Sequence, residues 1–113
     1  MNFNDYQKQA ITTDTFGGTG QVTDPAFITK ILGLVGEAGE VAEKFKKILR
    51  DKDANLSDAD KAEIVKELGD VLWYISSITH YLGVPLQEVA DVNLEKVHSR
   101  KKRGVTHGSG DNR

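Results

Sequence analysis

The stretch DPAFITKILGLVGEAGEVAEKFKKILR, residues 24–50, decides the fold. Asp24 can accept hydrogen bonds from the free amides of a first helical turn, and Pro25 suits the first helical position. Apolar residues then recur at the spacing of one helix face, and a second apolar row (Leu34, Val41 and Ile48) widens that face. We therefore expect one long helix buried in a bundle. Its main apolar row is Phe27, Ile31, Val35, Ala38, Ala42, Phe45 and Leu49.

Three further segments have helical spacing, about residues 4–13, 58–82 and 85–102. Ser57 is a capping residue before the second of these, and Gly83 and Gly104 are helix-ending residues. Four helices with short connections predict an all-α, antiparallel four-helix bundle-type domain that oligomerises through helix packing. We expect residues 1–113 to form a single domain in which residues 104–113 are a flexible C-terminal tail.

Composition excludes several classes of protein. No apolar run approaches the roughly 20 residues of a membrane span. The first ten residues lack the basic and apolar regions of a signal peptide. The absence of cysteine excludes disulfides and thiolate ligands, so that any metal site must use oxygen or imidazole donors. We expect a cytoplasmic protein with no membrane partner.

Charge is distributed unevenly along the chain. Residues 96–113 contain six Lys or Arg and one Asp, a balance of +5, whereas the rest contains nine Lys or Arg and 16 Asp or Glu, a balance of −7. The basic stretch SRKKRG, residues 99–104, suits a helix C-terminus, a nucleic-acid backbone or a triphosphate. Because no aromatic residues are interleaved with these charges, we do not expect a nucleic-acid partner.

Two matched acidic motifs carry the chemistry, EAGEVA at residues 37–42 and ELGDVL at residues 67–72. In each motif the two acids are three residues apart and project from neighbouring positions on one helix surface. Both pairs flank the apolar stripe of their helix on the same side and at equivalent angles. If the two helices pack antiparallel, the four carboxylates can converge. They are Glu37, Glu40, Glu67 and Asp70.

Convergent carboxylates repel one another unless cations neutralise them. Oxygen-only ligands favour Mg²⁺, with Mn²⁺ as a substitute, and Mg²⁺ commonly binds substrate phosphates as well. Gly39 and Gly69, one in each motif, cost about 1 kcal/mol each relative to Ala, and suggest that a backbone or ligand comes close. A single E-x-x-E is usually a solvated helix face, but two matched pairs favour a metal site suited to phosphoanhydride hydrolysis.

The two motifs and their context resemble the MazG-like, all-α nucleotide pyrophosphohydrolase superfamily. The family pattern is E-x-x-E, a spacer, and then E-x-x-D, and here 26 residues separate the two motifs. The similarity includes GLVGEAGEVAEKFKK (33–47), KELGDVLWYIS (66–76) and NLEKVHSRKKRG (93–104). It covers about residues 28–113 and is that of a short, single-domain member.

The resemblance implies hydrolysis of a nucleoside triphosphate between the α and β phosphates, in nucleotide-pool housecleaning. It implies that the four motif acids are Mg²⁺ ligands. One of the Glu residues could instead orient or deprotonate the attacking water. It implies a homodimer or homotetramer whose site a neighbouring chain often completes. It also suggests that Asp111 and Arg113 close over the site. The implied substrate-binding residues are Asn93, Lys96, Arg100, Lys101, Arg103 and Arg113.

Two alternatives stay open at this point. Within the superfamily, a phosphoribosyl-ATP pyrophosphatase or a dimeric dUTPase has the same chemistry with a different base pocket. Outside enzymes, the chain could be a catalytically inactive helical interaction module. Intact acids at all four motif positions favour an enzyme.

Overall fold

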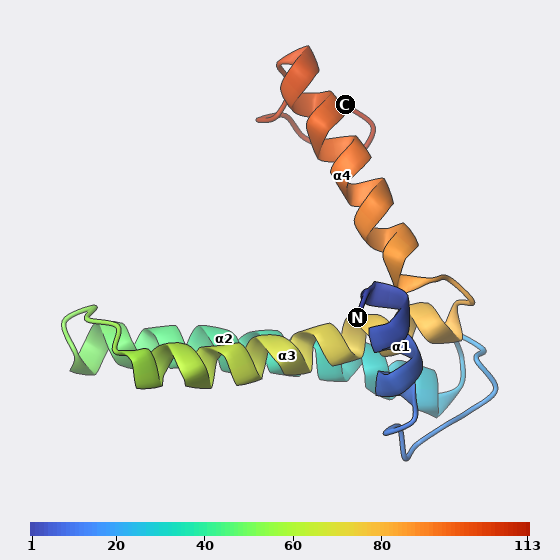
Figure 1. Ribbon diagram of the computed structural model, residues 1–113, viewed down its shortest axis with the longest axis horizontal. Helices are drawn as coiled ribbons and strands as arrows, with labels where there is room; N and C mark the ends of the chain where they lie inside the picture. The colour runs from blue at the N-terminus through green and yellow to red at the C-terminus, as the bar shows by residue number, and fades with distance from the viewer.

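The computed structural model describes residues 1–113 and consists of four helices without strands, as the sequence predicts. They are α1 (Phe3–Ile11), α2 (Pro25–Asp51), α3 (Asp58–Tyr81) and α4 (Leu86–Arg103). Figure 1 shows α2 and α3 side by side as a long antiparallel hairpin, with α1 across its base and α4 projecting away. None of the helices combines the length and apolarity needed to span a bilayer.

The predicted capping residues set the helix ends. The Asp24 side chain accepts a hydrogen bond from the Ala26 amide, and Ser57 and Asp60 form a reciprocal capping box at the start of α3. Gly83 and Gly104 adopt left-handed φ angles of 73° and 72° directly after α3 and α4. Local signals in the sequence therefore account for where the helices begin and end.

A buried glutamine joins α1 to the base of the hairpin. The Gln7 side-chain nitrogen donates to the Thr79 hydroxyl and to the Val84 carbonyl, each at 3.0 Å, and its oxygen accepts from the Leu86 amide. These bonds tie α1, the end of α3 and the start of α4 together. Ala10 of α1 is buried as well, whereas the sequence has no local signal that marks Gln7 as a buried residue.

A buried ion pair holds the loop between α1 and α2 against the hairpin. Lys30 Nζ lies 2.8 Å from an Asp14 carboxylate oxygen, and both side chains are almost fully buried. The Tyr81 hydroxyl also donates to Asp14, which raises the pKa of Tyr81 to about 12. The same ammonium group lies 5.8–5.9 Å from the ring centroids of Phe16, Trp73 and Tyr81, a cation–π distance. The loop is thereby fixed next to the hairpin.

Most of the apolar row that the sequence predicts as the core of α2 is exposed within one chain. Val35 and Leu49 are 68% and 65% exposed, and only Phe27 of the large residues in that row is buried. The second row supplies the more sheltered side chains instead: Leu34 and Val41 are half-buried and Ile48 is buried. The more apolar face of α2 therefore has no partner within the chain.

Gly33 of α2 lies against the ring of Tyr74 on α3. A Cβ atom at this position would overlap the ring of Tyr74, so that only glycine allows the approach. Gly39 and Gly69, for which the sequence predicts a close neighbour, face open space, and no backbone of this chain approaches them. The close neighbour that the sequence predicts is therefore not found within this chain.

The shape of the chain is extended for its length. The radius of gyration is 16.9 Å, whereas a compact domain of this length has a value of about 13 Å. The accessible surface is 7887 Å², against roughly 6,100 Å² for a folded monomer of this mass. A single chain thus exposes well over 1,000 Å² more surface than a compact domain of the same mass, consistent with the exposed face of α2.

Candidate metal centre

Three of the four motif acids converge between α2 and α3. Carboxylate oxygens of Glu37, from α2, and of Glu67 and Asp70, from α3, all lie within 4.8 Å of one another. The antiparallel pairing of the two helices brings these motifs to the same level of the hairpin (Figure 1). Glu37 and Glu67 are half-buried and Asp70 is exposed, so that the group is open to solvent on one side.

Glu40 lies outside this group of three and is exposed. Glu37 and Val41 are the half-buried positions on this part of α2, and Glu40 lies one 100° step away from Val41 around the helix. Its charge still acts on the group, since it is one of the neighbours that raise the pKa of Glu37. Glu40 is thus an outer member of the acidic cluster.

The cluster has little positive charge to balance it. Lys44 Nζ lies 3.8 Å from a Glu67 oxygen, so that it bridges the two helices instead of pairing with Glu40 one turn before it. The pKa of Glu37 is raised, first by its partial burial and then by the charges of Asp70, Glu67 and Glu40. A cation brought to this point would relieve that repulsion.

The donor set fits a hard divalent cation. All donors are carboxylate oxygens, with no sulfur or imidazole ligand in the group. Such a set favours Mg²⁺ or Mn²⁺ over Zn²⁺, and its open side leaves room for water and phosphate oxygens. The residues that would hold the ion are Glu37, Glu67 and Asp70, with Glu40 next to them.

A hollow of about 330 Å³ opens beside the carboxylates, lined by Thr13, Glu37, Asp70, Trp73 and Tyr74. Trp73 Nε1 donates to the Thr13 hydroxyl at 2.8 Å, which joins the end of α1 to this wall. Trp73 and Tyr74 follow Asp70 by one helical turn, a signal from which their place beside the site could have been inferred. Thr13 comes from a distant segment and has no such signal.

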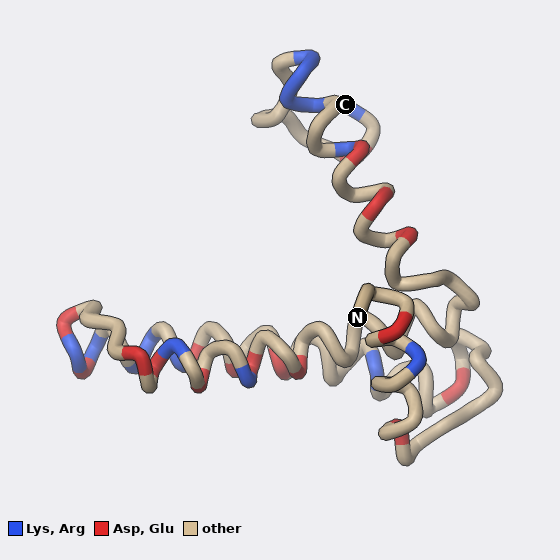
Figure 2. The backbone as a smooth tube through the Cα atoms, in the orientation of Figure 1, with Lys and Arg blue, Asp and Glu red and all other residues tan.

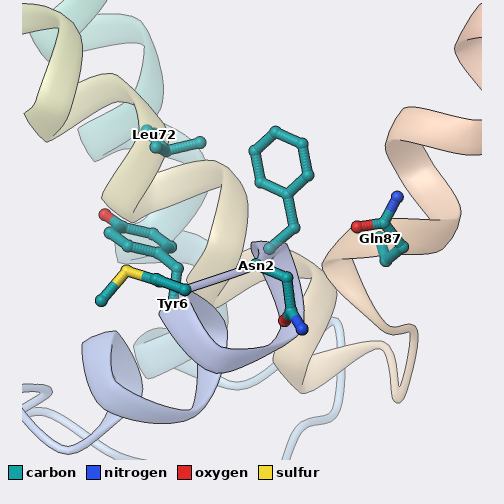
Figure 3. Close-up of a pocket in the computed structure, with 6 residues that line it drawn as sticks. Asn2, Tyr6, Leu72 and Gln87 are labelled. Atoms are coloured by element: carbon teal, nitrogen blue, oxygen red, sulfur yellow. The ribbon is translucent and has the colours of Figure 1, made fainter.

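A second, mostly apolar hollow of about 430 Å³ lies where α1, α3 and the start of α4 meet (Figure 3). Tyr6 and Leu72 form its wall on the side of the hairpin, and Asn2 and Gln87 place amides at its edge. The pKa of Tyr6 is raised, first by burial and then by the charge of Asp70. This mostly apolar hollow therefore lies within range of the charge of Asp70.

The predicted phosphate-binding residues lie on α4 and in the tail, apart from the acids. Figure 2 shows Lys and Arg gathered at the far end of α4, with Asp and Glu on the part of α4 nearer the hairpin and both signs of charge along the hairpin. Because α4 projects away and makes no contact with α2, one chain does not bring these two sets of residues together. Asn93 and Lys96 border a shallow hollow on α4, and Lys101 is exposed.

The fold and the site define an all-α protein in which two antiparallel helices present a carboxylate cluster suited to a hard cation. The chain matches the MazG nucleotide pyrophosphohydrolase domain over residues 26–105, and it belongs to this family. It is also 45% identical, over the full length of both chains, to the Gene 37 protein of Mycobacterium phage L5. No solved structure matches the chain.

Proposed function

We propose that the protein is a Mg²⁺-dependent nucleoside triphosphate pyrophosphohydrolase. The observation that carries this proposal is the convergence of Glu37, Glu67 and Asp70 within 4.8 Å in a chain of the MazG family. The reaction breaks the bond between the α and β phosphates and yields a nucleoside monophosphate and pyrophosphate. When bound, the metal would neutralise phosphate charge and lower the pKa of a bound water.

The acids divide into two roles in this proposal. The three clustered carboxylates hold the ion, because they already point toward one position. Glu40, exposed and one step around the helix, is free to orient the attacking water or to join the ligands. The hollow beside them, with the rings of Trp73 and Tyr74 in its wall, would accept part of the nucleotide.

We further propose that a second copy of the chain covers the exposed face of α2 and α3, to give a homodimer or homotetramer. The excess surface of one chain is larger than the roughly 800 Å² that each partner buries in a standard interface. Ile31, Val35, Phe45 and Leu49 on α2 and Val65 and Leu68 on α3 are large apolar side chains between 41% and 68% exposed. Two such hairpins together would make the four-helix bundle that one hairpin lacks.

In this assembly, α4 of one chain would supply phosphate-binding groups to the acids of the other. The reason is geometric: α4 projects away from its own hairpin, and Asn93, Lys96 and Arg100 lie on that projecting helix. Lys101, Arg103 and Arg113 stay predicted contacts of the substrate as well. The predicted cytoplasmic location and the single-domain organisation over residues 1–113 are likewise parts of the proposal.

A nucleotide panel, assayed with and without Mg²⁺ and with products separated by chromatography, tests this function. We expect monophosphate and pyrophosphate only when the metal is present. Preferential turnover of phosphoribosyl-ATP or dUTP would select one of the two related pyrophosphohydrolases. Absence of turnover with Mg²⁺ and with Mn²⁺, from a folded oligomer, would instead favour the inactive interaction module.

A further inference from the structure

The C-terminal tail, residues 104–113, folds back along the last turns of α4. Gly104, in its left-handed conformation, reverses the chain, and Arg113 then fixes the returning segment. The guanidinium of Arg113 donates hydrogen bonds to three backbone carbonyls of the tail, those of Val105, Thr106 and Gly110. The tail is thereby closed into a small loop whose position relative to α4 is defined.

This loop places Asp111 on two cations of α4. One carboxylate oxygen, Oδ1, lies 3.3 Å from Lys96 Nζ and 3.3 Å from Arg100 Nη2. The side chain of Asp111 is 83% exposed, and its second carboxylate oxygen has no hydrogen bond to the protein. A single shared oxygen at these distances is a weak, exchangeable contact.

Arg100 is poorly satisfied by this arrangement. The residue is 7% exposed, and its Nε atom is buried without any hydrogen-bond partner. A matching anion would accept two parallel hydrogen bonds from the guanidinium, whereas the tail engages only Nη2. Buried donors of a charged group are seldom left unpaired, and such an atom suggests that a ligand is missing.

We propose that Asp111 is an internal stand-in for a phosphate on Lys96 and Arg100, the cations of α4 that the proposed function assigns to the substrate. A terminal phosphoryl group has three oxygens, enough to accept from Nε and Nη2 of Arg100 and from Lys96 at once. The carboxylate must leave before the phosphate binds, so that the tail lowers the affinity of the site for polyphosphate. This inference rests on the proposed function in taking these cations to bind phosphate and the phosphate to be that of a nucleotide.

The test is calorimetric titration of inorganic tripolyphosphate, without divalent cation, into the wild-type protein and into Asp111→Asn. We expect Asp111→Asn to bind about three- to tenfold more tightly, because the competing charge is gone while the neutral amide keeps its size. Asp53→Asn, at the exposed turn between α2 and α3, removes the same charge far from α4 and is the matched control. It should bind as the wild type does.

Two results would overturn the proposal. Weaker or unchanged binding by Asp111→Asn, relative to Asp53→Asn, would mean that the carboxylate assists the ligand or takes no part. Unchanged binding of tripolyphosphate by Arg100→Gln would show that Arg100 is not part of a phosphate-binding site.

Neither measurement involves hydrolysis, so the two proposals can fail separately. If Asp111→Asn shows no gain in binding while nucleotides are hydrolysed, the proposal for Asp111 is wrong and the proposed enzymatic function is right. If the gain appears but no nucleotide is hydrolysed, the phosphoryl site is right and the enzymatic function is wrong.

Discussion

The middle of the α2–α3 hairpin carries a cluster of acids, and the far end of α4 carries a cluster of cations. The two clusters differ in whether groups of opposite charge lie against them. In the hairpin, three carboxylates share one position, with Lys44 at 3.8 Å from one of them as the nearby cation. At the end of α4, the cations Lys96 and Arg100 are already contacted by a carboxylate of their own tail. The acidic cluster therefore has little positive charge of its own, whereas Lys96 and Arg100 on α4 already have a carboxylate against them.

If the protein has the function proposed above, neither region is a whole active site. Binding a triphosphate with its metal requires carboxylates for the ion and cations for the phosphates, and these lie on different parts of an extended chain (Figure 2). A second copy that covers the exposed face of α2 would allow the two halves to meet. The central claim is therefore that the site is shared between chains.

The largest expected effect is at the acidic half. Asp70→Asn keeps the size of the side chain but removes a charged ligand, and we expect hydrolysis to fall at least about 100-fold. Far-ultraviolet circular dichroism should remain helical, and Mg²⁺ should no longer raise the melting temperature.

The matched control for that substitution is Asp58→Asn, in the exposed first turn of the same helix. It should retain nearly full activity. Comparable activity of Asp70→Asn and the wild type would show that the cluster is not the metal site.

The next largest effect is expected on association through the exposed apolar face of α2 and α3. Val35→Asp introduces a carboxylate into the proposed interface, and in a two-fold dimer the change counts twice. We expect association to weaken at least about 30-fold, with loss of activity, because an unpaired charge is costly to bury. Sedimentation velocity over a concentration series measures it.

Asn55→Asp, at the exposed hairpin turn, adds the same charge outside that face and should leave the oligomer intact. If the wild-type chain sediments as a monomer at all concentrations, the exposed face has some other role.

The smallest expected effects are shifts in the pKa values of one carboxyl group in each region. In the metal-free protein, the pKa of Glu37 should lie above its ordinary 4.5, because of burial and then of neighbouring acids. The pKa of Asp111 should lie below 3.8, because Arg100 and then Lys96 favour its charged form. Carboxyl carbon resonances followed by NMR give both midpoints.

The two shifts have opposite consequences for stability. Repulsion of the Glu37 carboxylate destabilises the fold fully at pH values above its raised folded-state pKa. This destabilisation is relieved as the pH falls from there toward the pKa of Glu37 in the unfolded chain. The contact of Asp111 is present above its unfolded value and is lost as pH falls through its lowered folded-state pKa. If the pKa values of Glu37 and Asp111 were both raised or both lowered, the two regions would not differ in the way described here.

The sequence predicted what is decided locally. Caps such as Asp24 and Ser57 and stops such as Gly83 act within one or two turns, so that the four helices and their ends follow from neighbouring residues. The meeting of Glu37 with the acids of α3 also followed, because the two motifs occupy equivalent angles on two antiparallel helices.

The sequence did not predict which partners the residues take at long range. Two apolar rows run along α2, and periodicity alone cannot tell which faces α3 and which is left for another chain. The Asp14–Lys30 pair and the bonds of Gln7 join segments with no local signal. The contact between Asp111 and Arg100 likewise depends on the path of the returning tail.

The most direct test of a shared site mixes two variants, Asp70→Asn and Arg100→Gln, after dissociation and reassociation. Each should be nearly inactive alone. If one chain gives the acids and the other the cations, a mixed dimer has one site with both defects and one intact site. Activity should then recover to about a quarter of the wild-type value. No recovery, although mixed dimers are shown to form, would place both halves in the same chain and contradict the account.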